Sequence, residues 1–181
     1  MNEARNKVFI ATSLDGYIAD KNGGLDWLHA TPNPEGIDMG YGQFMDEIDA
    51  LVMGRNTFET VCNFDMPWPY QKPVFVLTNT LKKVPNKAEG KATLVSGSLK
   101  DVLEEIHKQG YHQLYIDGGQ TIQNFLEEDL IDEMIITTIP VLLGGGTPLF
   151  GKLSVPIHFR CVESQLFLNS IVQSRYVRIN G

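Results

Sequence analysis

The sequence has little cysteine and no long hydrophobic run. Its two cysteines, Cys62 and Cys161, are too few and too far apart to suggest a disulfide framework or a metal site. No apolar run approaches the roughly 20 residues that span a bilayer. The N-terminal residues carry no apolar segment of the signal-peptide kind. We therefore expect a cytoplasmic protein with no membrane partner.

Positive charge and paired histidines are also scarce. The formal net charge is −7, and no stripe of lysine or arginine offsets it, which argues against a nucleic-acid partner. The four histidines are scattered without metal-ligand spacing, so no metal is expected. The net charge does not exclude a phosphorylated small ligand, because the binding of such a ligand depends on the local groups that contact it more than on the net charge of the protein.

What the sequence does contain is typical of one globular α/β domain over residues 1–181. Hydrophobic residues make up 43% and charged residues 20% of the chain. Strands alternate with helices, which predicts a mostly parallel sheet with helices on both faces. Expected strands cover 7–14, 17–19, 51–54, 73–79, 92–95, 113–117 and 131–140, and expected helices cover 41–49, 98–109 and 120–127, with a short one from 55. Residues 158–167 and 171–179 predict a closing antiparallel hairpin.

Three polar or glycine-led turns follow predicted strands. They are Gly54-Arg55-Asn56-Thr57, Thr78-Asn79 and Gly118-Gly119-Gln120-Thr121. Ligands of open α/β sheets bind at the carboxyl ends of the strands. A glycine before a helix N-terminus lets a phosphate approach free backbone N–H groups. The three turns together favour a nucleotide with its phosphates on two helix N-termini, whereas any one of them could be an ordinary corner.

Several motifs in this order resemble the dihydrofolate reductase superfamily, and most closely the stand-alone bacterial proteins similar to the reductase domain of riboflavin biosynthesis. The motifs are residues 13–19 (SLDGYIA), 49–59 (DALVMGRNTFE), 76–79 (VLTN), 115–119 (YIDGG), 130–133 (LIDE) and 139–146 (IPVLLGGG). The resemblance implies a dihydrofolate reductase-like fold. It also implies a reductase that transfers hydride from NADPH to a carbon–nitrogen double bond of a small heterocyclic or imine substrate.

The resemblance also assigns cofactor contacts. It places the nicotinamide carboxamide against Ala11 and Ile18. The adenosine and pyrophosphate contacts fall on Gly54, Arg55 and Thr57, the adenosine pocket on Leu77, Thr78 and Asn79, and the pyrophosphate on Gly118, Gly119, Gln120, Thr121 and Ile122. In this superfamily the bond matching Gly118–Gly119 is often cis, a form that is rare elsewhere.

Two aspartates are candidates for the catalytic carboxylate. Counting back fifteen residues from Met53, as in dihydrofolate reductases, leads to Asp38, where burial would raise the pKa of a carboxyl toward working pH. A helix N-cap explains Asp38 equally well. Asp15 lies in the SLDG motif shared with the riboflavin-pathway reductases, but an Asp-Gly turn is the simpler interpretation.

Two further residues match superfamily positions. Thr137 matches a hydroxyl that often pairs with the catalytic carboxylate, and Trp27 matches a tryptophan of the active-site loop. An aromatic plug of the core is an equally good interpretation of Trp27.

The departures from the superfamily narrow the function. The arginine that clamps the folate carboxylate is missing from residues 67–73, which argues against a dedicated folate enzyme. The deaminase signature of riboflavin enzymes is absent too. NADPH rather than NADH rests on Arg55, with Lys82 or Lys83 in support, because no arginine follows Leu77. The alternatives are the 5-amino-6-(5-phosphoribosylamino)uracil reductase of riboflavin synthesis and a non-catalytic NADPH-binding module.

A glycine-rich segment at 143–146 lies between apolar residues 141–142 and 149–150. An apolar patch of this kind usually marks an interface, and related reductases pair through this region. We therefore expect a homodimer.

Overall fold

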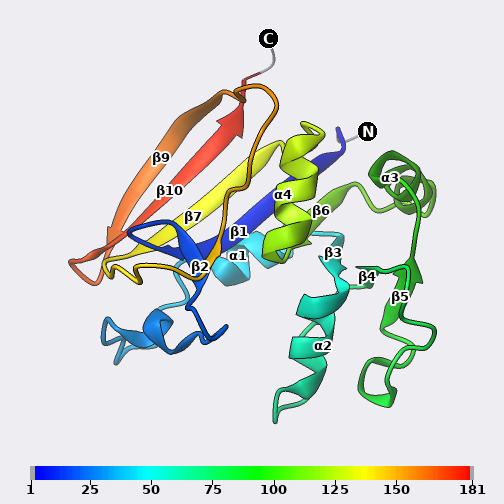
Figure 1. Ribbon diagram of the computed structural model, residues 1–181, viewed down its shortest axis with the longest axis horizontal. Coiled ribbons are helices and arrows are strands. Elements are labelled where there is room, and N and C mark those ends of the chain that lie inside the picture. Colours follow the sequence, from blue (N-terminus) through cyan, green and yellow to red (C-terminus); the bar gives the residue numbers. More distant parts are fainter. Residues whose placement is uncertain (1–2, 180–181) are drawn as a thin grey trace.

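The computed structural model describes residues 3–179, which fold around one large β-sheet (Figure 1). The strands are β1 Arg5–Ser13, β2 Tyr17–Ala19, β3 Ala50–Gly54, β4 Val74–Leu77, β5 Ala92–Val95, β6 Gln113–Asp117, β7 Glu133–Ile139, β8 Thr147–Pro148, β9 Phe159–Phe167 and β10 Ile171–Arg178. The helices are α1 Tyr41–Asp46, α2 Arg55–Asn63, α3 Leu99–Lys108 and α4 Gly119–Glu127, with short 3-10 turns η1 Asp26–His29 and η2 Asn86–Ala88.

Eight strands pair in the order β5-β4-β3-β6-β1-β7-β10-β9. Every neighbouring pair from β5 to β7 in this order is parallel. β10 pairs antiparallel with β7, and β9 pairs antiparallel with β10. A helix or loop crossover can return the chain parallel, whereas the tight turn at Leu168 and Asn169, both at positive φ, can only make a hairpin. The predicted mostly parallel sheet and its C-terminal hairpin are confirmed.

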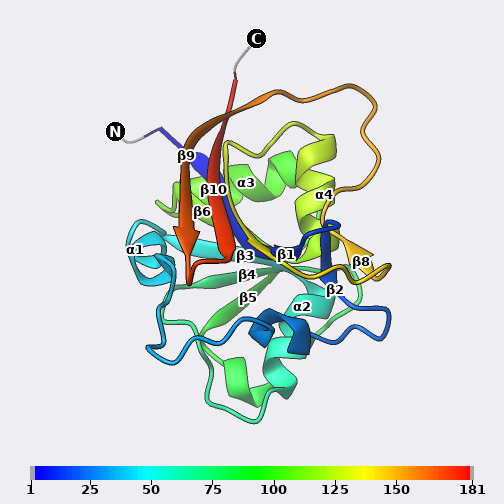
Figure 2. The ribbon, with the colours of Figure 1, turned by 90° about the vertical axis from the view of Figure 1, so that its left-hand side faces the viewer.

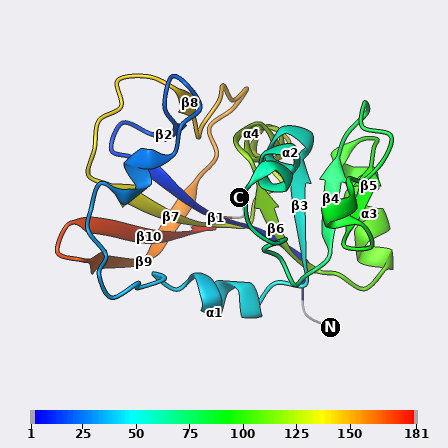
Figure 3. The ribbon, with the colours of Figure 1, turned by 90° about the horizontal axis from the view of Figure 1, so that it is seen from below.

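Alternating strand residues bury two separate cores. On one face Val8, Val52 and Ile116 pack with residues of α3 and α4. On the other face Met53 and Tyr115 pack with Phe44 of α1 and Phe58 of α2. Seen from the β9 edge, α1 lies on one side of the sheet and α4 with β2 and β8 on the other, and the view from below agrees (Figures 2 and 3). Helices therefore cover both faces, as predicted.

Some local expectations are wrong. α1 ends at Asp46 instead of continuing to about residue 49, and its N-cap is Gly40, at φ 84°, rather than Asp38. α2 extends over nine residues from Arg55 to Asn63, longer than the short helix expected from residue 55. Residues 3–179 contain no cis peptide bond, so Gly118–Gly119 is trans, contrary to what the resemblance implied. Within the same range, no helix is both long enough and apolar enough to cross a membrane.

Candidate active site

The β3–α2 turn and the β6–α4 turn lie against each other at the carboxyl edge of the sheet. A Cβ added to Gly54 would lie 2.7 Å from Thr121 Oγ1, on the other turn. A Cβ added to Gly118, which has φ +97°, would collide with Thr57 Oγ1 in return. Each of these positions must therefore be glycine, because a threonine of the opposite turn occupies the space that a Cβ would need. The parallel neighbours β3 and β6 produce this approach because their ends meet at one edge.

Both helices that leave these turns have open N-termini. α2 and α4 have nine residues each, and neither N-cap residue, Gly54 or Gly118, offers a side chain to the first N–H groups. Those N–H groups and the two helix dipoles favour a negatively charged group between the turns. The threonines occupy the space beside the two glycines, so a pyrophosphate here would be held by the N–H groups of the two open helix N-termini.

The third predicted turn joins the same edge. Leu77 at the end of β4 is in register with Gly54. The hydroxyl of Thr78 accepts hydrogen bonds from the N–H groups of Thr80 and Leu81, so it shapes its own turn, and Asn79 is exposed beside it. We call the turns at residues 54–57, 77–79 and 118–122 the glycine edge.

Arg55 is the cation of the glycine edge. Its side chain is exposed, and Nη2 donates to Asn56 Oδ1 at 3.2 Å. No carboxylate of residues 3–179 forms an ion pair with it. An unpaired guanidinium beside two helix N-termini suits recognition of a phosphate.

The remaining predicted cofactor residues lie around this edge. A Cβ on Gly119 would lie 2.5 Å from Ile18 Cδ1, so Ile18 covers the β6–α4 turn. Ala11 is in register with Thr137 on β7. In α4 the Gln120 amide bonds Asn124, while Thr121 and Ile122 are buried. The tertiary structure thus brings all three predicted turns and Ile18 together.

Asp117, the last residue of β6, is a candidate that the sequence analysis missed. It lies two residues after Tyr115 and therefore faces the α1 side of the sheet. Burial raises the pKa of its carboxyl to about 6, although the Gly118 N–H group, which donates to it at 2.9 Å, lowers it. Burial and the Asp117 charge in turn raise the pKa of Tyr41 and of Tyr70. The only signal in the sequence was an acidic residue directly before the Gly-Gly pair.

Asp38 does not have the burial that its catalytic interpretation required. Its carboxylate is exposed and accepts hydrogen bonds from Gly42 N at 2.9 Å and Gly40 N at 3.0 Å. These two bonds, that from Gly42 first, lower the pKa of Asp38. The geometry is that of a cap for the start of α1, placed two residues before the formal N-cap.

Asp15 joins two loops. Its carboxylate accepts the hydroxyl of Ser13 at 2.6 Å and the N–H groups of Leu143 and Gly144 at 3.1 and 2.8 Å. The Ser13 hydrogen bond is the largest of the effects that lower the pKa of Asp15 to about 2. At neutral pH this group carries no proton to donate, and it ties the SLDG turn to the glycine-rich loop.

Thr137 and Trp27 lie on the α1 side of the sheet, but neither contacts Asp38 through a hydrogen bond. The buried Thr137 hydroxyl accepts from Gln173 Nε2, which also donates to Met39 O, both at 2.9 Å. Trp27 is 8% exposed and packs with Ile139 and Ile171. Its Nε1 is buried without a partner among the described residues. A buried donor of this kind costs about 1–3 kcal/mol unless a ligand or water accepts from it.

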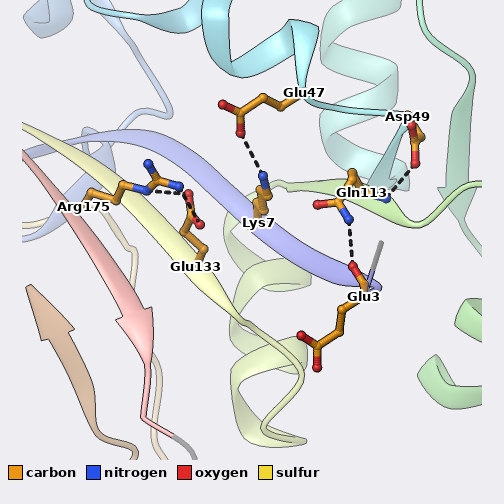
Figure 4. Close-up of polar contacts among 7 residues, drawn as sticks. All are labelled: Glu3, Lys7, Glu47, Asp49, Gln113, Glu133 and Arg175. Carbon is orange, nitrogen blue, oxygen red and sulfur yellow. Dashed lines mark hydrogen bonds and ion pairs between the residues drawn. The ribbon is translucent and has the colours of Figure 1, made fainter. Parts of the chain in front are cut away.

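A cavity of about 330 Å³ opens beside these residues on the α1 side. We call it the α1 chamber. It lies between α1 and strands β1, β7, β10 and β9, and its lining includes Phe9, Gln43, Glu47, Glu163 and Arg175. Two ion pairs border it: Lys7 of β1 reaches Glu47, and Arg175 of β10 reaches Glu133 of β7 (Figure 4).

Several known proteins are similar to this chain in sequence and in fold. The family model of the RibD C-terminal domain matches residues 7–173. A Bacillus subtilis protein of uncharacterized function, YwjB, is 35% identical over 178 residues, which cover 97% of this chain and 99% of YwjB.

Two solved structures illustrate the range of similarity. A crystal structure from Shewanella sp. PV-4, provisionally described as a riboflavin biosynthesis protein, is 56% identical, with a TM-score of 0.95 and coverage of 97% and 99% of the two chains. The dihydrofolate reductase of Enterococcus faecalis, complexed with NADP(H), is 19% identical with a TM-score of 0.62 and 97% coverage of both chains. The second likeness concerns the fold alone, and it confirms the dihydrofolate reductase-like architecture.

Proposed function

This chain belongs to the family of the RibD C-terminal domain, and from that premise we propose that it is an NADPH-dependent reductase acting on a carbon–nitrogen double bond of a small heterocyclic or imine substrate. Membership of the family supports a reductase in general. The cofactor and the kind of substrate are our inference from the site.

The observation that carries the proposal is the pair of interlocked turns, Gly54 against Thr121 and Gly118 against Thr57. Their glycines, with the open N-termini of α2 and α4, would hold the pyrophosphate of NADPH, and Arg55 would hold its 2′-phosphate. Ala11 and Ile18 would contact the nicotinamide. When bound, NADPH supplies a hydride.

Asp117 is our candidate for the proton that the reduced nitrogen needs. A carboxyl with a pKa of about 6 keeps a useful protonated fraction near neutral pH, unlike Asp15. Aromatic residues lie near Asp117. Its negative charge helps to raise the pKa of Tyr41, Tyr70 and Tyr115. The ring of Tyr70 packs edge-on against that of Trp68, with the ring centroids 5.4 Å apart. Such walls suit a planar ring. Asp38 stays a predicted alternative, as the fifteen-residue spacing suggests.

The 5-amino-6-(5-phosphoribosylamino)uracil reductase is a second candidate activity, consistent with the provisional description of the 56% identical Shewanella protein as a riboflavin biosynthesis protein. The alternative that is not an enzyme is a module that binds NADPH without catalysing a reaction.

Cofactor titration followed by stopped-flow hydride transfer tests the proposal. We expect NADPH to bind more tightly than NADH and to be oxidised with one or more cyclic imines. Asp117→Asn should slow hydride transfer by about 10²- to 10⁴-fold at pH 7 without weakening NADPH binding. The matched variant Asp38→Asn decides between the two carboxylates, since only the proton donor should show the loss. Tight NADPH binding without oxidation of any imine would favour the non-catalytic module.

We also propose that the protein is a cytoplasmic homodimer. Leu142 and Phe150, on either side of the glycine-rich loop, are 69% and 51% exposed, and Leu153 and Val155 follow at 42% and 68%. Exposed apolar side chains clustered on one segment suit an interface with a second copy. Light scattering coupled to size exclusion tests this, and a monomer at micromolar concentration would refute it.

A further inference from the structure

The α1 chamber adjoins the surroundings of Asp117 through shared aromatic side chains. The ring of Phe9, which lines the chamber, lies 5.5 Å from that of Tyr41 and 5.0 Å from that of Phe44. The negative charge of Asp117 is one of the causes that raise the pKa of Tyr41. The chamber volume of about 330 Å³ is at the lower end of small-molecule pockets, about 300–1,000 Å³. Neither Asp117 nor Tyr41 lines the chamber, so a molecule whose ring lies beside Asp117 would extend a substituent into it past Phe9 and Phe44.

The charges of the chamber are mostly negative. Three carboxylates line it, those of Glu47, Glu133 and Glu163, against one guanidinium, that of Arg175. Arg175 is already engaged: its Nε lies 2.9 Å from Glu133 Oε1, and its Nη2 donates to Glu133 Oε2 at 3.0 Å (Figure 4). The Glu133 side chain is only 2% exposed, so its charge depends on this pair.

The other basic side chain nearby is also engaged. Lys7 Nζ, on a side chain 7% exposed, bonds Glu47 Oε2 at 3.0 Å. Glu163 is exposed and forms no ion pair within residues 3–179. The same carboxylates raise the pKa of Arg175. The Glu133 hydrogen bond raises it most, and the charges of Glu47 and Glu163 raise it further.

A phosphate would meet a poor environment here. Glu133 occupies Nε and Nη2 of Arg175, so a phosphate could reach the remaining N–H groups of Arg175 only beside the Glu133 carboxylate, which would repel it. It would also face the unpaired Glu163. A group that is neutral or positively charged is not repelled by these two carboxylates.

The polar side chains of the chamber are suited to hydrogen bonding. Gln43 and Gln165 form no side-chain hydrogen bonds with the described residues, so their amides are free to donate and accept. Gln173 uses Nε2 for Thr137 and Met39, which leaves its Oε1 as an acceptor. Together with the oxygens of Glu163, these groups suit a substituent that carries amino, amide or hydroxyl groups.

Building on the proposed reductase function, we infer that the substrate is not phosphorylated and that the α1 chamber receives a neutral or cationic, amino- or hydroxyl-bearing substituent of it. The chamber is thereby the part of the site that selects substrates by charge. This separates the protein from a reductase of phosphoribosyl compounds.

Calorimetric titration with two pyrimidine probes tests the inference. The probes share one ring and carry either a 2-aminoethyl or a 2-phosphoethyl arm. We expect the wild-type protein to bind the aminoethyl probe at least about tenfold more tightly, since opposite charges attract and like charges repel at this range. Glu163→Lys should reduce this preference by about tenfold or more. Glu105→Lys, an equal change of charge at an exposed carboxylate of α3, should leave the preference unchanged.

Each probe is titrated with and without saturating NADPH, so that the two proposals fail in different ways. Absence of NADPH binding would count against the reductase, whereas the ratio of the two probe affinities is measured independently of it. The inference is overturned by equal or tighter binding of the phosphoethyl probe. It is also overturned if the ratio is the same in Glu163→Lys, or if neither probe binds at millimolar concentration.

Discussion

The glycine edge and the α1 chamber are built in opposite ways. The glycine edge consists of short contiguous turns whose backbone N–H groups are the proposed phosphate contacts, and Thr57 and Thr121 occupy the space beside the glycines of the opposite turns. The α1 chamber is lined by side chains from α1 and four strands that are far apart in the sequence. The first region presents donors that every peptide has, and the second presents charges that only particular residues have.

This difference suggests a division of labour. A backbone cradle can bind the same phosphates in many relatives without depending on side-chain identity. A chamber made of side chains can change its charge through single substitutions while the strands stay in place. Cofactor binding should therefore tolerate changes in the chamber, and substrate selection should tolerate changes at the glycine edge that spare the backbone.

The largest effect should follow from Gly118→Val. Its φ of +97° is unfavourable for a branched residue, and the new side chain would push against Thr57. Strain of about 1–2 kcal/mol and overpacking of about 1–3 kcal/mol should lower the free energy of unfolding by roughly 2–5 kcal/mol. The displaced turn should also weaken NADPH binding by about tenfold or more, measured by calorimetry. Gly97→Val is the control, because Gly97 also has positive φ but open space around it. Equal losses in both variants would show that general strain, not the cradle, is responsible.

Asp117→Asn should change how stability depends on pH. The pKa of Asp117 is raised from 3.8 to about 6, so between about pH 4 and pH 6 the folded protein keeps a proton that the unfolded chain has lost. The wild-type protein therefore loses stability as the pH rises through this window, by up to about 3 kcal/mol. The Asn variant should not show this loss. Urea unfolding at pH 4, 6 and 8 measures it, and parallel curves for the two proteins would contradict the raised pKa.

Arg55→Ala should separate the two nicotinamide cofactors. Loss of a charge-assisted bond to the 2′-phosphate should weaken NADPH binding by about 1.5–3 kcal/mol and NADH binding much less. Arg160→Ala, which removes the same charge from an exposed position of β9, is a control for general electrostatics. Identical losses for both cofactors would assign Arg55 to the pyrophosphate instead.

Gln173→Leu should give the smallest change and should affect the chamber alone. The variant loses the hydrogen bonds to Thr137 and Met39, which should cost about 1–2 kcal/mol in free energy of unfolding. We expect weaker binding of the aminoethyl probe with unchanged NADPH affinity, both by calorimetry. A matching loss of NADPH affinity would mean that the two regions are coupled, not independent.

The glycine edge was largely predictable from the sequence, and Asp117, the carboxylate that we propose as proton donor, was not. Gly54 stands directly after an apolar run and Gly118 one residue after another, so the position of each turn is a local property. The raised pKa of Asp117 arises from its partial burial in the folded protein, which no local sequence pattern indicates. Asp38 shows how spacing alone leaves alternatives open. Its distance from Met53 suggested a partly buried acid and its place a helix cap, and the structure has it exposed and bonded to the N–H groups of Gly40 and Gly42 at the start of α1.

The sequence by itself determined the order of strands and helices, the closing hairpin and the three turns, because hydrophobic periodicity and glycine act over a few residues. Only the tertiary structure decided that Asp15 ties two loops, that Lys7 and Glu133 are buried ion-pair members, and that Glu163 stands near Arg175. Burial and charge balance depend on sums over residues that are distant in the chain. Such sums take definite values only once the sheet has brought β1, β7, β10 and β9 side by side.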